Sequence, residues 1–235
     1  MTVQLTSPAQ LSALPEKGIT AQKIRALLAA YGTGYDFCRF YRHNGDSFLA
    51  GMGGSFVLCA GGGADCEELA QFLNFSGCAE LLCDSECGGK INGSLGSELM
   101  RVNVMRYGGT GVPCEMECSP PLSEIYDIVG TAFGFEYEPW YLDMSHRVRH
   151  GVARCRKLEG SALVIQHDIN GEALISQVAT LPAQRGRGLA SGLVSSVCAE
   201  LCGREIYLLC EDGLIPFYRK NGFEVCGDLA QLTRK

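Results

Sequence analysis

The sequence lacks any long hydrophobic run. No stretch of its 235 residues approaches the roughly 18 consecutive apolar residues that a membrane-spanning helix needs. Residues 1–18 also lack the basic segment and apolar core of a secretory signal peptide. We therefore expect a cytoplasmic protein with no membrane partner.

An excess of positive charge is also missing. The chain has 20 Lys and Arg residues against 26 Asp and Glu, a formal net charge of −6. This balance disfavours binding to nucleic acid and permits a cationic substrate. Hydrophobic residues make up 46% and charged residues 20% of the chain, as in ordinary globular proteins, and its length allows one large or two small domains.

Metal-binding cysteine patterns are absent, although the chain has 13 cysteines. Cys78, Cys83 and Cys87 are spaced by five and four residues, which does not match the paired CxxC spacing of zinc sites. We expect no metal and interpret most of the cysteines as small, reduced, buried residues.

The clearest local pattern is a strand, a glycine turn and a helix between residues 173 and 202. Residues 173–180 are apolar and rich in β-branched side chains, which predicts a buried strand. A helix is predicted from Leu189 to Leu201, because apolar residues recur there at spacings of three and four.

The turn between them has the chemistry of an anion site. The first turn of a helix has backbone N–H groups without partners and a positive end of the helix dipole. Gly186 and Gly188 leave the backbone accessible, and Arg185 and Arg187 add charge and hydrogen-bond donors. The alternative interpretation is an ordinary loop with a solvated basic turn.

A second strand and a second helix follow the predicted helix over residues 189–201. Residues 204–210 predict another strand, and residues 214–220 a short helix that ends at Asn221-Gly222. Phe223 then begins a further strand.

Together these segments resemble the GCN5-related N-acetyltransferase (GNAT) family. The segment Arg185–Ala190 matches the pyrophosphate-binding pattern [Q/R]xxGx[G/A] of that family, and Tyr218 with Gly222-Phe223 matches its later signature. The resemblance extends from about Tyr126 to Phe223. It implies an α/β fold with a mixed, mostly antiparallel twisted sheet flanked by helices.

The resemblance also implies acetyl-CoA as the acyl donor. Backbone groups of Val178, Ala179 and Thr180 would pair with the pantetheine arm, and Tyr218 would act as the general acid that protonates the CoA thiolate. The alternative role of Tyr218 is that of a packed aromatic residue with a solvated hydroxyl. The pyrophosphate would lie on the turn, which comprises Arg185, Gly186, Arg187, Gly188, Leu189, Ala190 and Ser191.

The sequence departs from the family at two points. Glu211 stands where many members have Asn; it could bind the cofactor through water, hold a helix start, or be solvated. The carboxylate that usually acts as general base has no clear match on the two predicted strands. A base acting through water, or an amine that arrives deprotonated, would replace it.

Residues 136–151 are predicted to line the acceptor site. This stretch holds the only tryptophan, Trp140, and two of the four histidines, His146 and His150. The histidines could bind the acceptor and relay a proton near neutral pH. Alternatively, they belong to a basic last helical turn, where cations are favoured by the helix dipole.

The N-terminal half shows neither signature. Its order of predicted elements is compatible with a degenerate GNAT-like copy. Gly61-Gly62-Gly63 before a helix over 65–75 imitates a phosphate loop, but no basic residue lies near it and a turn is favoured. The glycine- and serine-rich residues 84–98 predict a linker. We therefore expect an accessory or degenerate domain at 1–98 and a catalytic domain at 99–235.

These patterns predict an N-acetyltransferase that moves an acetyl group from acetyl-CoA to a primary amine. The acceptor is expected to be a small molecule or a peptide, and the protein a monomer or homodimer. The alternative is a catalytically silent CoA-binding sensor or scaffold, because a fold does not fix a function.

Overall fold

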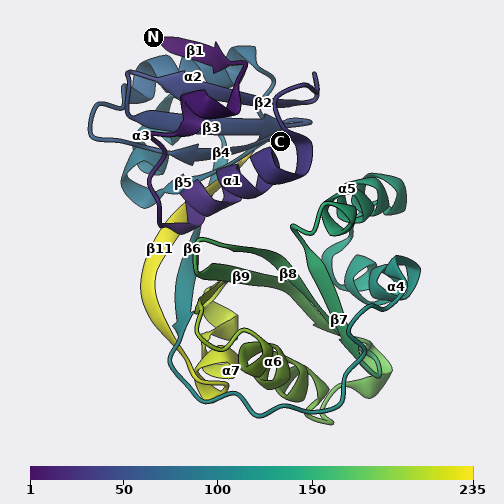
Figure 1. Ribbon diagram of the computed structural model, residues 1–235. Helices are drawn as coiled ribbons and strands as arrows, with labels where there is room; N and C mark the ends of the chain where they lie inside the picture. Colours follow the sequence, from purple (N-terminus) through teal and green to yellow (C-terminus); the bar gives the residue numbers. More distant parts are fainter. Residues whose placement is uncertain (235) are drawn as a thin grey trace. The chain divides into compact units, whose positions relative to one another are not determined.

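The computed structural model describes residues 1–234, which form two compact units. The first unit comprises Met1–Val104 together with the chain from Gly227 on, and the second comprises Met105–Cys226. The division falls inside two strands, β6 (Glu98–Tyr107) and β11 (Phe223–Thr233), so both strands contribute residues to each unit (Figure 1).

The first unit contains a mixed sheet in the order β1-β2-β3-β4-β5-β11. Strands β1 to β4 are antiparallel neighbours, β4 and β5 are parallel, and β5 pairs antiparallel with residues 229–233 of β11. The elements, in chain order, are β1 (Thr2–Leu5), α1 (Ile19–Tyr31), β2 (Cys38–His43), β3 (Ser47–Met52), β4 (Ser55–Cys59), α2 (Cys66–Phe75), β5 (Glu80–Asp84) and α3 (Ser85–Leu95).

Helices cover the two faces of this sheet. Leu49 of β3 lies in a buried cluster with residues of α2 and α3, such as Leu69 and Ile91. Because successive strand residues point to opposite faces, its buried neighbours Phe48 and Ala50 face the other way, and α1 contacts the same strand.

The second unit is likewise built on a mixed sheet. Its sheet runs β6-β10-β9-β8-β7, antiparallel from β7 to β9 and parallel between β9 and β10. The remaining elements are α4 (Leu122–Phe133), α5 (Tyr137–Arg149), β7 (Arg154–Leu158), β8 (Ser161–Ile169), β9 (Glu172–Thr180), α6 (Leu189–Glu200), β10 (Glu205–Cys210) and α7 (Ile215–Lys220).

Successive residues of β8 point to opposite faces of this sheet, and different helices cover the two faces. Leu163 and Ile165 pack with residues of α6, whereas Ala162 and Val164 pack with residues of α4 and α5. Figure 1 shows α6 and α7 on one side of β8 and β9, and α4 and α5 on the other. The predicted fold class, a mixed, mostly antiparallel sheet flanked by helices, is confirmed.

The two units share one order of elements. In each, three antiparallel strands lead through a helix to a parallel strand and then through a second helix to a further strand. Helix α2 thus corresponds to α6, and the loop before α2 corresponds to the glycine turn before α6.

Residues 85–95 form α3, so the prediction of a linker over residues 84–98 is wrong. Asp84 caps α3 by accepting a hydrogen bond from the N–H of Cys87 at 2.8 Å. A Cβ on Gly88 would lie 2.4 Å from the Cβ of Ala230, so glycine permits the close packing of α3 on β11. Tertiary packing here outweighs the low helix propensity of glycine.

No helix among residues 1–234 is long and apolar enough to cross a bilayer.

A buried ion pair fixes α6 against β7. Arg156 of β7 donates two hydrogen bonds to the Glu200 carboxylate at the end of α6, from Nε at 2.7 Å and from Nη2 at 2.6 Å. Arg156 also donates to the carbonyl oxygens of Cys118 and Cys155. The guanidinium is therefore satisfied although the side chain is buried.

We predict that Glu200→Ala lowers the free energy of unfolding by about 3 kcal/mol, because it leaves the Arg156 charge buried without its partner. Urea denaturation measures this loss. The matched control is Lys157→Met, which removes ion pairs to the more exposed Glu117 and Glu124 and should cost less than about 1 kcal/mol. Equal losses in the two variants would contradict the assignment.

Candidate functional site

Strand β9 separates from β10 along most of its length. The registered pairs between them are Glu172 with Glu205, Ala173 with Ile206, and Leu174 with Tyr207. Beyond Leu174, β9 continues to Thr180, and no residue of β10 within the described chain pairs with this part of β9. The predicted cofactor residues Val178, Ala179 and Thr180 lie on this part of the strand, which leaves one backbone edge for a ligand.

A bulge interrupts β9 at the same place. Val164 of β8 pairs with Ser176 and Ala162 pairs with Ala179, so β9 holds one extra residue between these pairs. Gln177 lies in the bulge with φ of 50°, a left-handed conformation that is uncommon outside glycine. The Oγ of Ser176 is buried, with no hydrogen-bond partner in the described part of the chain.

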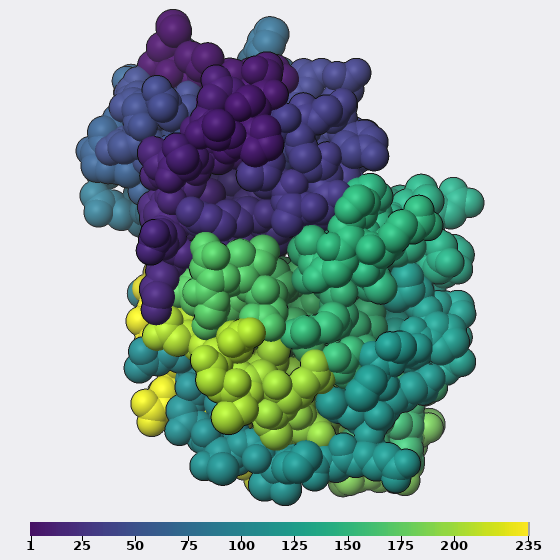
Figure 2. All heavy atoms as spheres, in the orientation of Figure 1, coloured from purple at the N-terminus to yellow at the C-terminus, as the bar shows by residue number. Residues whose placement is uncertain are grey.

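The glycine turn presents free backbone donors. Gly188 begins α6 as an N-cap with φ of 80°, and no side chain caps the helix. The first backbone bond of α6 is from Gly192 to the Gly188 carbonyl at 2.9 Å. Among residues 1–234, no acceptor binds the N–H groups of Leu189, Ala190 and Ser191. In Figure 2 the yellow-green segment that contains α6 lies at the surface of the second unit.

Side-chain contacts fix the conformation of the glycine turn. Gln184 Oε1 accepts a hydrogen bond from the N–H of Gly160 at 3.1 Å, and a Cβ at Gly160 would lie 2.6 Å from the Gln184 side chain. Arg187 forms an ion pair with Glu159 at 2.8 Å, and Arg185 Nε donates to the Thr180 carbonyl at 3.2 Å. The turn is therefore tied to the β7–β8 hairpin and to the end of β9.

Tyr218 lies in the core beside these strands. It comes from α7, is 6% exposed, and packs with Cys210 of β10 and with Phe223. Burial raises the pKa of Tyr218 well above its ordinary value, and the nearby Cys210 adds to the shift. The hydroxyl therefore keeps its proton across the physiological pH range.

The predicted acceptor residues fall into two places on α5. Trp140 donates from Nε1 to the Gln177 side chain at 3.1 Å, so it contacts the bulge directly. His146 and His150 lie together near the end of the helix, with ring centroids 4.3 Å apart. Six residues of helix span about 9 Å, so the histidine pair is well separated from Trp140 along α5.

Glu211 directly follows β10 and is exposed. Its carbonyl accepts a backbone hydrogen bond from Leu214, which closes the short turn before α7. It stands at the separated end of β10, on the same unit as the glycine turn. No cluster of three or more His, Cys, Asp or Glu side chains within residues 1–234 is arranged to hold a metal ion.

The corresponding loop of the first unit is closed by its own side chains. Asp46 accepts a hydrogen bond at 3.1 Å, His43 Nε2 accepts one at 3.1 Å, and Asp65 Oδ1 accepts two. The donors are the N–H groups of Gly63, Asp65, Glu67 and Glu68. The groups that an anion would use before α2 therefore already have partners, and Glu67 and Glu68 add negative charge to its first turn.

Comparison with known proteins agrees with this geometry. Residues 146–225 match the acetyltransferase (GNAT) domain family. The matched range includes β9, the glycine turn, α6 and Tyr218. The predicted resemblance to the GNAT family is thus confirmed, and acetyl transfer is supported as the general activity.

Solved structures show the GNAT fold over nearly the whole chain. A GCN5-related N-acetyltransferase from Kribbella flavida is 16% identical with a TM-score of 0.64, covering 92% of this chain and 96% of that one. One from Sphaerobacter thermophilus is 16% identical with a TM-score of 0.57, covering 98% and 94%. A tandem GNAT protein of clavulanic acid biosynthesis is 12% identical with a TM-score of 0.57, covering 99% and 97%. No curated protein sequence matches the chain.

The sequence did not identify three residues of this candidate site. Gln177 and Ser176 were parts of a continuous apolar strand pattern, and Gln184 was a neutral residue inside the turn. The roles of Gln177 and Gln184 depend on contacts with Trp140 and Gly160, which lie at least 24 residues away. The only feature of the local sequence that pointed to one of these residues is the position of Gln184, directly before Arg185 and Gly186.

His43 gives the closed loop a pH dependence. The side chain is fully buried, its Nε2 accepts from Asp65, and its Nδ1 shares a hydrogen bond with the Thr2 hydroxyl at 2.9 Å. Burial lowers the pKa of His43 below its ordinary value, and the Glu68 carboxylate opposes the shift only in part. The neutral ring is thus the form that the folded protein favours.

We predict that the free energy of unfolding falls as the pH drops below about 6.5, because the unfolded chain then binds a proton that the folded His43 resists. The loss has an upper limit of about 1.4 kcal/mol per pH unit for one group. His43→Gln, which keeps an acceptor and a donor, should lose this slope in urea titrations between pH 7 and 5. An unchanged slope would contradict the role of His43.

Proposed function

We propose that the second unit transfers an acetyl group from acetyl-CoA to the primary amine of a small molecule or peptide in the cytoplasm. One observation carries this proposal: the uncapped N-terminus of α6 follows a strand whose edge is free of its parallel neighbour. If the start of α6 binds the pyrophosphate, the pantetheine arm attached to it would extend along that edge of β9.

The cofactor site would use backbone groups. The N–H groups from Gly186 to Ser191 would bind the pyrophosphate, where the helix dipole favours negative charge. Arg185 and Arg187 would raise the local positive potential, although both already contact protein groups. Val178, Ala179 and Thr180 would pair with the pantetheine arm, and Glu211 would contact the cofactor through water from the end of β10.

The chemistry would proceed by direct transfer. The amine nitrogen attacks the thioester carbonyl carbon and loses a proton through water, the carbon–sulfur bond breaks, and the thiolate accepts a proton. Backbone N–H groups near the β9 bulge would stabilise the developing oxyanion. Tyr218 would donate the proton, because burial keeps its hydroxyl protonated and a general acid must enter the reaction in that form.

The acceptor would approach from α5. Trp140 already contacts Gln177 of the bulge, so it would form the wall nearest the acetyl group. Ser176, with its unpartnered buried hydroxyl, would offer a hydrogen bond there. His146 and His150 would bind a more distant part of the acceptor or relay a proton from it.

The first unit would be an accessory copy. It repeats the element order of the second unit, but its own side chains occupy the loop before α2. We propose this role for the domain expected at residues 1–98, with the catalytic machinery within the domain expected at 99–235. The protein would be a monomer or a homodimer.

A silent CoA-binding sensor is the second candidate. The observation in its favour is that Gln177, a residue that cannot act as a base, occupies the bulge where β9 turns toward α5. Turnover decides between the two candidates, because a sensor would bind acetyl-CoA without releasing free CoA in the presence of an amine.

We predict that Tyr218→Phe lowers kcat for acetyl transfer about 100-fold, because loss of a general acid typically costs that factor or more. The KM for acetyl-CoA should change little. Release of CoA thiol, measured with a panel of primary amines, gives both constants. The matched control is Tyr207→Phe, which changes another tyrosine of the same unit and should retain activity.

Equal kcat values for wild type and Tyr218→Phe would remove Tyr218 from the reaction. Absence of turnover with every amine, in protein that binds acetyl-CoA, would favour the sensor.

A further inference from the structure

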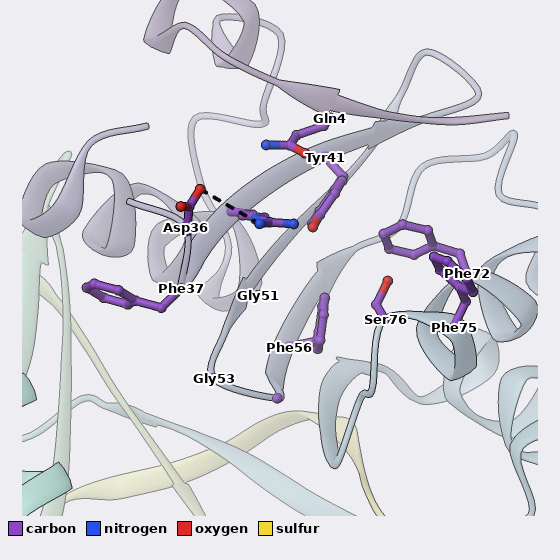
Figure 3. A pocket seen from close by; sticks show the side chains of 12 residues that line it. Gln4, Asp36, Phe37, Tyr41, Gly51, Gly53, Phe56, Phe72, Phe75 and Ser76 are labelled. Carbon is purple, nitrogen blue, oxygen red and sulfur yellow. Dashed lines mark ion pairs between the residues drawn. The ribbon is translucent and has the colours of Figure 1, made fainter. Parts of the chain in front are cut away.

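The first unit has a groove of 560 Å³ on its sheet, far along the chain from the residues of the GNAT site. We call it the aromatic groove and define it by Phe37, Arg39, Tyr41, Phe56, Phe72 and Phe75. Figure 3 shows side chains from β2 and β4 and from the end of α2 around one hollow. Its volume lies within the range of small-molecule sites, about 300–1,000 Å³.

Five of the residues that line the groove are aromatic. Tyr41 and Phe72 meet edge to face, with ring centroids 4.8 Å apart. Phe75 is 93% exposed, whereas the ring of Phe37 packs against Tyr31 and Tyr35, with ring centroids 5.6 and 5.0 Å away. An exposed phenylalanine such as Phe75 contributes little to a core, but it offers a ring face to a ligand.

The floor of the aromatic groove has space for a flat ligand group. Gly51, Gly53 and Gly54 line the groove without side chains. A Cβ at Gly51 would lie 2.4 Å from the ring of Phe56, so the glycine lets that ring lie against the strand. The surface below the walls is therefore backbone and one aromatic ring.

One positively charged side chain, Arg39, and one carboxylate, Asp36, line the groove. The Arg39 side chain is 46% exposed, and its only partner among residues 1–234 is the Asp36 carboxylate at 3.8 Å. This distance is too long for a hydrogen bond, and the Asp36 side chain is itself fully exposed. The planar guanidinium thus retains donors that match the two oxygens of a carboxylate.

We propose that the aromatic groove binds a planar aromatic carboxylate. The rings of the ligand would stack on Phe75 over the glycine floor, and its carboxylate would pair with Arg39. This site is separate from acetyl transfer, because the first unit has closed the loop that would otherwise hold a cofactor.

The test uses two probes that differ only in charge, 2-naphthoate and 2-naphthamide. Their fluorescence anisotropy is followed during titration with the full-length protein, alone and with saturating acetyl-CoA. The variants are Arg39→Gln, Arg39→Lys and Phe75→Ser. Phe133→Ser, which changes an exposed phenylalanine of the second unit, is the matched control.

We expect wild-type protein to bind 2-naphthoate at least about tenfold more tightly than 2-naphthamide, the factor that 1.4 kcal/mol corresponds to. Arg39→Gln should remove this preference and Arg39→Lys should keep part of it. Phe75→Ser should weaken both probes, whereas Phe133→Ser and acetyl-CoA should change neither. Arg39 and Phe75 are exposed, so the melting temperature should stay constant.

Three results would overturn the proposal. They are no binding of 2-naphthoate, equal binding of the two probes, and binding that Arg39→Gln and Phe75→Ser leave unchanged. Displacement by acetyl-CoA would place the probe in the second unit and also overturn it. None of these results bears on acetyl transfer, which the amine panel tests separately.

Discussion

The backbone N–H groups at the start of α6 are the constraint on which the second unit depends. A helix start without a side-chain cap leaves donors that need an acceptor, and here the first residues of α6 have none among those described. The surrounding contacts keep the helix start in this state. Arg156 and Glu200 fix the far end of α6, and Gln184 with Gly160 fixes the turn.

The two units solve the same physical problem in opposite ways. In the first unit, Asp46, His43 and Asp65 accept the hydrogen bonds of the loop before α2. In the second, glycines replace such side chains and the donors stay open. A repeated element order can therefore support a ligand site in one copy and a self-contained structural loop in the other.

Contiguous features could be predicted from the sequence. The strand, the glycine turn, α6 and Tyr218 lie in one stretch with regular spacing, and the family resemblance followed from them. The Trp140–Gln177 contact and the β9 bulge could not be predicted, because they depend on residues brought together by folding. Residues 84–98 were assigned to a linker because glycine disfavours helices, but packing of Gly88 against Ala230 reverses that preference.

Calorimetric titration of acetyl-CoA tests the central claim most directly. The open donors of α6 and the closed loop of the first unit together predict one binding site per chain. Arg185→Glu with Gly188→Glu should abolish it, because the added carboxylates oppose the anion and Gly188 has a backbone conformation that side chains disfavour. Two sites per chain, no binding by the wild type, or undiminished binding by the double variant would contradict the account.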